Sequence, residues 1–220
     1  MATDPVLVQL ESASEADVWR LARLTPREKI FICLVADVCQ AALGAPFARH
    51  VAYANREGVT AEDLREALRF MAYDSGYHVA TAAMERLDEL ERPEPVDATA
   101  RVQAIAARAS ATENPLPGFV RARLDDLGEH FTGFMGLQSR MRTDTTLSQR
   151  ERAFMTMTID VLYQTLDDTF RMHATRALNN GADRETVREA VCFGALFGAA
   201  RAWNALRALK DFYAELDAKT

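Results

Sequence analysis

The chain contains an internal duplication, and this feature limits its possible folds more than any other. The stretch Asp160–Gly181 matches Asp37–Gly58 at a constant offset of 123 residues. The match extends without a gap over Leu24–Leu87, where 18 of 64 positions are identical to their counterparts. An internal repeat of this length constrains the whole fold, because each copy forms the same structural unit. Two copies predict a duplicated domain whose halves share one core, rather than a solenoid.

Each repeat predicts a helix hairpin followed by one long helix. Thr25–Glu28 combines a hydroxyl cap, a proline at the first helical position and a glutamate at the third, which is typical of a helix start. The second helix of repeat one should run from about Phe47 to Gly58, and the third from Thr60 to about Leu90. No segment alternates apolar and polar residues convincingly, so we expect an all-α fold without a sheet.

Two proline-containing breaks, Glu91–Asp97 and Glu113–Gly118, divide the chain. Residues up to Glu15 are expected to form a short arm. The segment Phe119–Arg142 predicts one amphipathic helix that leads into repeat two, with a much shorter counterpart before repeat one. The predicted divisions are an N-terminal repeat, connecting helices with a linker, and a C-terminal repeat, at residues 1–90, 91–146 and 147–220.

The run Val191–Ala200 is apolar around its whole circumference, so a helix formed by it must be covered on every side. Gly194 and Gly198 lie one turn apart and would let another helix approach closely. A packed core is the favoured interpretation, and a ligand channel is the alternative.

The composition argues against several classes of function. A net charge of −6 and a pI near 5.3 argue against nucleic acid as a partner. No apolar stretch reaches the roughly 18 residues that a bilayer requires, and the first residues do not resemble a signal peptide. The cysteines, Cys33, Cys39 and Cys192, are odd in number and give neither a disulfide framework nor a zinc site. We therefore expect a cytoplasmic protein without a metal site.

Asp37 and His50 are the first candidates for chemistry. In an antiparallel hairpin with a rise of about 1.5 Å per residue, they reach similar heights on adjacent helices. Asp160 and His173 repeat this spacing in the second copy. A carboxylate beside an imidazole orients the ring and makes it a candidate acid or base. A structural ion pair, inherited twice with the hairpin, explains the pattern equally well.

Further polar residues could bind an anionic substrate, although each could equally be a surface charge. Arg171, Arg176 and Arg201 belong to this group. His130, in the segment before repeat two, has no counterpart in repeat one; a solvent-facing or capping role is the more common one for such a histidine.

Several motifs resemble the carboxymuconolactone decarboxylase family. They are LxxRExxF, F-x-x-H, NxG, the E-x-x-REA helix start and a closing helix rich in small residues, and they cover Leu24–Leu90 and Leu147–Leu216. Asn204 also matches a family asparagine, where repeat one has Thr81 at the 123-residue offset. The resemblance implies two all-α repeats that form a pseudo-twofold intramolecular dimer. Single-repeat members form hexamers built from dimers, so it also implies a homo-oligomer, with a trimer of this chain favoured.

The resemblance implies two alternative chemistries. The alkylhydroperoxidase D-like branch carries Cys-x-x-Cys before the histidine, but Leu166 and Thr169 occupy those positions here, so we do not expect a peroxidase. The other branch decarboxylates a carboxylated muconolactone without a cofactor, and its histidine matches His173.

We therefore predict a cofactor-independent lyase or isomerase that acts on a small or medium acidic carbonyl or lactone compound. His173 would be the acid–base residue, oriented by Asp160. His50 and Asp37 would form a second and weaker site, because repeat one lies further from the family pattern. The predicted substrate contacts are Arg171, Arg176, Arg201, Asn204 and His130. The alternative is a non-catalytic oligomeric scaffold or ligand-binding accessory protein of the same family.

Overall fold

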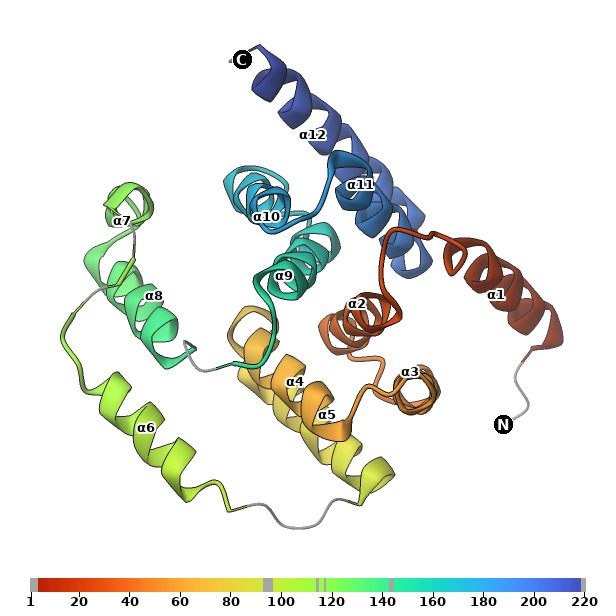
Figure 1. Cartoon of the computed structure of the whole chain (residues 1–220), viewed down its shortest axis with the longest axis horizontal. Coiled ribbons are helices and arrows are strands. Elements are labelled where there is room, and N and C mark those ends of the chain that lie inside the picture. Colours follow the sequence, from red (N-terminus) through yellow and green to blue (C-terminus); the bar gives the residue numbers. More distant parts are fainter. Residues whose placement is uncertain (1–3, 93–96, 114, 117, 143–144, 219–220) are drawn as a thin grey trace. The chain divides into compact units, whose positions relative to one another are not determined.

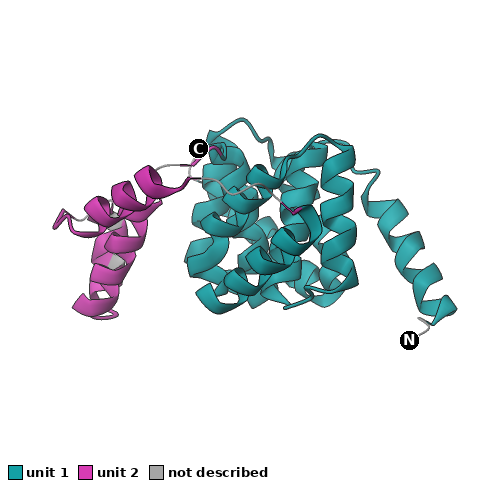
Figure 2. Ribbon diagram, turned by 90° about the horizontal axis from the view of Figure 1, so that it is seen from below, with its two compact units in different colours: residues 1–91, 147–220 teal, residues 92–146 magenta. Residues whose placement is uncertain are grey.

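A computed structural model describes residues 4–92, 97–113, 115–116, 118–142 and 145–218. Every regular element in these ranges is a helix, which confirms the all-α expectation. The helices form two compact units (Figure 2). One unit combines the residues up to 91 with those from 147 onward, and the other comprises residues 92–146. The helix hairpins of both repeats and the helices that follow them therefore belong to a single compact unit.

The helices of the first unit follow the order that the duplication predicts (Figure 1). Repeat one contains α1 (Pro5–Val18), α2 (Pro26–Cys39), α3 (Ala45–Arg56), α4 (Ala61–Ser75) and α5 (Tyr77–Glu91). Repeat two contains α9 (Gln149–Tyr163), α10 (Asp168–Asn179), α11 (Arg184–Phe193), the 3-10 turn η1 (Gly194–Phe197) and α12 (Ala199–Asp217). Helices α2 and α9 pack side by side in the middle of the unit, and most of their side chains are buried. The two repeats thus share a core.

The two central helices begin with the same local structure. The Thr25 hydroxyl accepts a hydrogen bond from the Glu28 N–H, and the Glu28 carboxylate accepts one from the Thr25 N–H. Ser148 and Glu151 repeat this capping box 123 residues later. Two otherwise unsatisfied N–H groups are paired at each helix start. The predicted cap of α4, Thr60, is also present.

Reciprocal ion pairs join the starts of α2 and α9. The Arg27 Nε lies 2.6 Å from a Glu151 carboxylate oxygen, and the Arg150 Nε lies 2.6 Å from a Glu28 carboxylate oxygen. Arg150 is the counterpart of Arg27, and Glu151 is the counterpart of Glu28. Each repeat therefore presents its arginine to the glutamate of the other. A twofold relation between two copies requires this kind of exchanged contact.

The expectation of one long third helix in each repeat is wrong. Gly76, at φ 103°, separates α4 from α5, and Gly198, at φ 149°, separates η1 from α12. A backbone at positive φ ends the regular helix, and glycine adopts it without the steric cost of a Cβ. The apolar run Val191–Ala200 is therefore not a continuous helix.

The offset between the repeats changes at this break. The buried face of α5 consists of Ala80, Ala83 and Leu87. The buried face of α12 includes Ala202, Ala205 and Leu209, and each of these follows its counterpart in α5 by 122 residues. Together with Gly76 and Gly198, they show that one residue is missing from repeat two relative to repeat one. The expected offset of 123 up to Leu87 is wrong beyond the break, and Asn204 aligns with Ala82 rather than Thr81.

The segments before the repeats also differ from expectation. The expected N-terminal arm is the 14-residue helix α1, whose first turn is capped by Asp4. In the second unit, α6 (Thr99–Ala109) is the expected connecting helix. The predicted single lead-in helix is instead divided into α7 (Gly118–Asp125) and α8 (Glu129–Met141), because Gly128 has a φ of 111°. Helices α1 and α8 have similar lengths, so the expected asymmetry between the lead-in segments is wrong.

Candidate functional site

The hairpin in each repeat brings a histidine onto a buried aspartate, as the spacing predicts. On α3, the His50 Nδ1 lies 2.6 Å from the Asp37 Oδ2 on α2. On α10, the His173 Nδ1 lies 2.7 Å from the Asp160 Oδ2 on α9. The aspartate side chains are 4% and 7% exposed, and the histidine side chains 13% and 12%. The predicted pairings are therefore confirmed, and each imidazole is close enough to the surface to meet a small molecule.

The pairing determines how each imidazole can react. A carboxylate only accepts hydrogen bonds, so we assign the hydrogen to Nδ1, which leaves the Nε2 lone pair free to accept a proton. Burial raises the pKa of Asp37, and the hydrogen bond and charge of His50 oppose this rise. The arrangement thus has the orientation that general acid–base catalysis requires.

The two pairs differ in what holds the aspartate. The Thr165 hydroxyl donates a hydrogen bond of 2.7 Å to the Asp160 Oδ1, the oxygen that His173 does not use. The counterpart of Thr165 in repeat one is Ala42, which has no hydroxyl. The Asp160 carboxylate is therefore held from both sides, which the motif spacing did not predict.

A cavity of about 690 Å³, broadly open to solvent, reaches His50. This volume lies within the range of small-molecule sites. Helices α1, α2 and α3 and the segment between α1 and α2 supply its walls, through Ser12, Glu15, Ala16, Trp19, Pro26, Lys29, Arg49, His50, Ala52, Tyr53 and Arg56. Sequence reasoning missed this site because it treated the residues of α1 as an arm. The sequence offered no clear signal for this wall, because α1 contributes Ser12, Glu15 and Ala16 to it, whereas the apolar residues at the start of α1 are exposed.

Lys29 is the most buried charged residue of this cavity, with 6% exposure. Its Nζ donates hydrogen bonds to the backbone carbonyls of Trp19, at 2.8 Å, and Leu21, at 2.5 Å. Burial lowers the pKa of Lys29, and the charge of Glu189 opposes this shift. Lys29 therefore fixes the segment between α1 and α2 to the cavity wall through backbone acceptors.

The other two cationic residues of the cavity lie on α3. Arg49 forms ion pairs with Glu11 and Glu15, both on α1. The Arg56 guanidinium lies over the Tyr53 ring, 5.1 Å from its centre. Arg49 thus fixes α1 as a wall, whereas Arg56 is held by an aromatic face.

Near His173, two of the predicted substrate contacts already have protein partners. The Arg171 guanidinium pairs with Glu215 on α12 at 2.7 Å. The Asn204 amide donates a hydrogen bond of 2.8 Å to the Gln164 side chain. Binding a substrate through either residue would compete with these contacts.

The remaining predicted contacts are distributed over three helices. Arg176 is partly exposed in the last turn of α10, and Arg201 is exposed on α12, where its carbonyl accepts a hydrogen bond from Gln164. His130 is exposed on α8, in the second unit. No contact joins these side chains into one group within the described residues.

A small crevice lies where α9 faces α11 and η1. Its volume is about 10 Å³, enough for about one water molecule. Gly194 lines it at the position where repeat one has Met71, so the missing side chain accounts for the space. The core interpretation fits the first part of the run, where Val191, Phe193 and Gly194 are buried. Ala199 and Ala200 are exposed, so the run is not covered on every side as expected.

The cysteines should be poor nucleophiles. Burial raises the pKa of Cys33 well above its usual value and raises that of Cys39 to about 11. The thiolate is the reactive form, and at pH 8 only about one Cys39 in a thousand would be a thiolate at any moment, which slows its modification. We expect iodoacetamide to leave Cys33 and Cys39 unmodified after an hour at pH 8, as read by intact-protein mass spectrometry, and to modify both in denaturant. Rapid native modification of Cys39 would contradict this.

Within the ranges that the structure describes, no three histidine, cysteine, aspartate or glutamate residues form a group that could hold a metal ion. In the same ranges, no helix combines the length and apolar character needed to cross a membrane.

The comparison with known proteins matches both repeats to one family. Residues 6–89 and 128–211 each match the carboxymuconolactone decarboxylase family. The first match includes α1 and the second includes α8, so the family unit begins with the helix before the central hairpin. No curated protein matches the chain. Because the matches cover most of its length, the chain belongs to the carboxymuconolactone decarboxylase family as a tandem duplicate.

Proposed function

We propose that the protein is a cofactor-independent enzyme of the lyase or isomerase type, acting on a small or medium acidic carbonyl or lactone compound. One observation carries this proposal. His50 lines a cavity of small-molecule size while Asp37 holds its Nδ1. An oriented imidazole beside a cavity is a minimal arrangement for proton transfer to or from a bound substrate.

We place the first catalytic site at His50, although the sequence alone favoured His173. The reason is the cavity, whose wall includes His50 and residues of α1. His173 with Asp160 is the second candidate site, supported by the same pairing geometry and by the family resemblance of its repeat. Variants of the two histidines distinguish these rankings.

The proposed reaction uses Nε2 of His50 as the proton carrier. In an isomerisation, Nε2 takes a proton from the carbon beside the carbonyl and returns it elsewhere, while Asp37 stabilises the imidazolium. In a decarboxylation, the electrons of the breaking C–C bond move toward the carbonyl oxygen, carbon dioxide leaves, and a protonated Nε2 donates to the remaining carbon. Lys29 would stabilise the negative charge that develops on the substrate.

Two assays test this proposal without knowledge of the natural substrate. The first measures carbon dioxide release from 3-oxo-3-phenylpropanoate and from a carboxylated muconolactone. The second follows deuterium exchange beside the carbonyl of 4-oxopentanoate by NMR. We expect catalysis in at least one assay, lost in a His50→Asn/His173→Asn double variant. Equal rates with the double variant and with the unchanged protein would refute the proposal.

We also propose that three chains assemble into a cytoplasmic homotrimer. The support is the family resemblance, in which hexamers are built from dimers, and the exchanged ion pairs that make each chain dimer-like. Sedimentation equilibrium should return three times the chain mass of 24.5 kDa. A mass equal to that of one chain at micromolar concentration would contradict the trimer.

A further inference from the structure

The cavity at His50 has a cationic lining in an acidic protein. Lys29, Arg49 and Arg56 face it with a single carboxylate, that of Glu15, whereas the chain carries a net charge of −6. A cavity whose lining carries an excess of one sign of charge concentrates ligands of the opposite sign. An anion is therefore the ligand that the charge distribution favours.

Lys29 provides the strongest argument for an anion. Its ammonium group has three N–H donors, and the carbonyls of Trp19 and Leu21 accept two of them. Among the described residues, no salt bridge joins Lys29 to a carboxylate. The charge of Glu189 acts on Lys29 without a salt bridge between them. A buried cation is costly unless it is paired. A ligand carboxylate in the cavity would accept the third hydrogen bond and pair with the ammonium group directly.

The two arginines are not equivalent. Arg49 already has carboxylate partners in Glu11 and Glu15. Arg56 is exposed and stacked on Tyr53, and within the described part of the chain no salt bridge joins it to a carboxylate. Arg56 is therefore the second donor that a ligand carboxylate can reach without displacing a protein carboxylate.

The apolar part of the cavity is aromatic. Trp19 and Tyr53 both line it, and their rings lie 4.4 Å apart between centroids. Aromatic faces and edges pair favourably with a further planar ring, and they add specificity to the burial of apolar area. The walls thus suit a flat ring better than a flexible chain.

We propose that this cavity binds an aromatic carboxylate, with its carboxylate on Lys29 and Arg56 and its ring against Trp19 and Tyr53. The inference rests on the proposed function, because it names the substrate class of the same site. In repeat two, Arg152 stands in place of Lys29, and Arg176 in place of Tyr53. Met172 and Asn179 stand in place of Arg49 and Arg56. The aromatic pair and the lysine therefore belong to repeat one alone.

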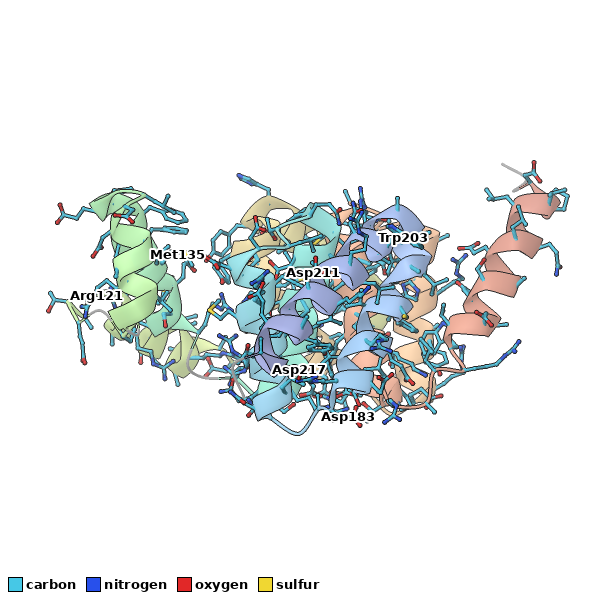
Figure 3. All side chains as sticks on the ribbon, turned by 90° about the horizontal axis from the view of Figure 1, so that it is seen from above. Arg121, Met135, Asp183, Trp203, Asp211 and Asp217 are labelled. Carbon is cyan, nitrogen blue, oxygen red and sulfur yellow. The ribbon has the colours of Figure 1, made fainter. Side chains whose placement is uncertain are left out.

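The fluorescence of Trp19 gives a direct binding assay. The other tryptophan, Trp203, is 66% exposed on α12 (Figure 3), so Trp203→Phe leaves Trp19 as the only reporter with little structural cost. Benzoate, its neutral analogue benzamide, acetate and inorganic phosphate are titrated at constant ionic strength. We expect benzoate to quench Trp19 with a Kd of about 1 mM, and the other three to bind at least tenfold more weakly.

Two substitutions in the Trp203→Phe background test the assigned contacts. Arg56→Gln, on the surface, should raise the benzoate Kd at least threefold, and Lys29→Met at least tenfold. Arg188→Gln, an exposed arginine on α11, is the matched control and should leave the Kd unchanged. Thermal melts identify any loss of folding in Lys29→Met, and Arg56→Gln keeps the test valid in that case.

Several outcomes would overturn the inference. Equal affinity for benzamide would exclude recognition of charge, and equal affinity for phosphate or acetate would exclude recognition of the ring. A benzoate Kd unchanged by Arg56→Gln and Lys29→Met would place the ligand elsewhere. Benzoate binding without catalysis in either assay would support the binding site and refute the proposed enzyme. Catalysis without benzoate binding would support the proposed enzyme and refute the aromatic carboxylate site.

Discussion

His50→Asn should lower the turnover of the protein by roughly a hundredfold or more, the usual scale for the loss of an acid–base group. Asparagine keeps a polar side chain of similar reach on α3 but cannot carry a proton between substrate and solvent. The measurement is the initial rate of carbon dioxide release or deuterium exchange, at substrate concentrations that separate kcat from KM. A true acid–base role should appear mainly in kcat.

His173→Asn is the matched comparison, because His173 pairs with Asp160 in nearly the same geometry as His50 with Asp37. If the cavity determines the working site, this variant should keep most of its activity. A large loss in His173→Asn alone would restore the ranking favoured by the sequence, and equal losses would indicate two working sites. Circular dichroism melts of both variants exclude unfolding as the cause.

Glu28→Ala should cost about 3 kcal/mol of unfolding free energy. The Glu28 side chain is 5% exposed, accepts the Thr25 N–H and pairs with Arg150 across the repeats. Its removal leaves a partly buried guanidinium without this partner and the Thr25 N–H without its side-chain acceptor, while the Thr25 hydroxyl still caps α2. At roughly 2–4 °C per kcal/mol for a chain of this length, the melting temperature should fall by about 6–12 °C.

The control for this substitution is Glu185→Ala. Glu185 pairs with Arg188 on the surface of α11, where both side chains are about half exposed. Exposed pairs contribute little, so this change should stay below about 1 kcal/mol. Glu151→Ala should cost nearly as much as Glu28→Ala, because it carries the equivalent contacts to Ser148 and Arg27. Costs that match the Glu185 control would mean that the exchanged pairs do not stabilise the fold.

Much of the fold could be predicted because it is encoded locally. The capping boxes at Thr25 and Ser148 and the glycines at the ends of α3 and α10 are short-range patterns. The breaks at Gly76 and Gly198 were missed because apolar periodicity continues across them, and periodicity does not report backbone angles. The one-residue shift between α5 and α12 was missed for the same reason.

The site was only partly predictable. The pairing of His50 with Asp37 followed from helix rise and turn position, since both residues lie on one hairpin. The cavity could not be predicted in this way, because part of its wall comes from α1. Nothing in the sequence shows against which helices this separate segment packs. The contacts of Arg171 with Glu215 and of Asn204 with Gln164 join separate elements, so they could not be predicted from the sequence either.

The exchanged pairs of Arg27 with Glu151 and Arg150 with Glu28 lie within one polypeptide, and this has a genetic consequence. In an assembly of identical chains, every substitution appears at all equivalent positions. Here each half has its own codons, so a substitution of Lys29 changes the lining of the cavity at His50 and leaves its counterpart in repeat two, Arg152, as it was. One half can acquire a new ligand while the other preserves the shared core, and the two can be selected independently.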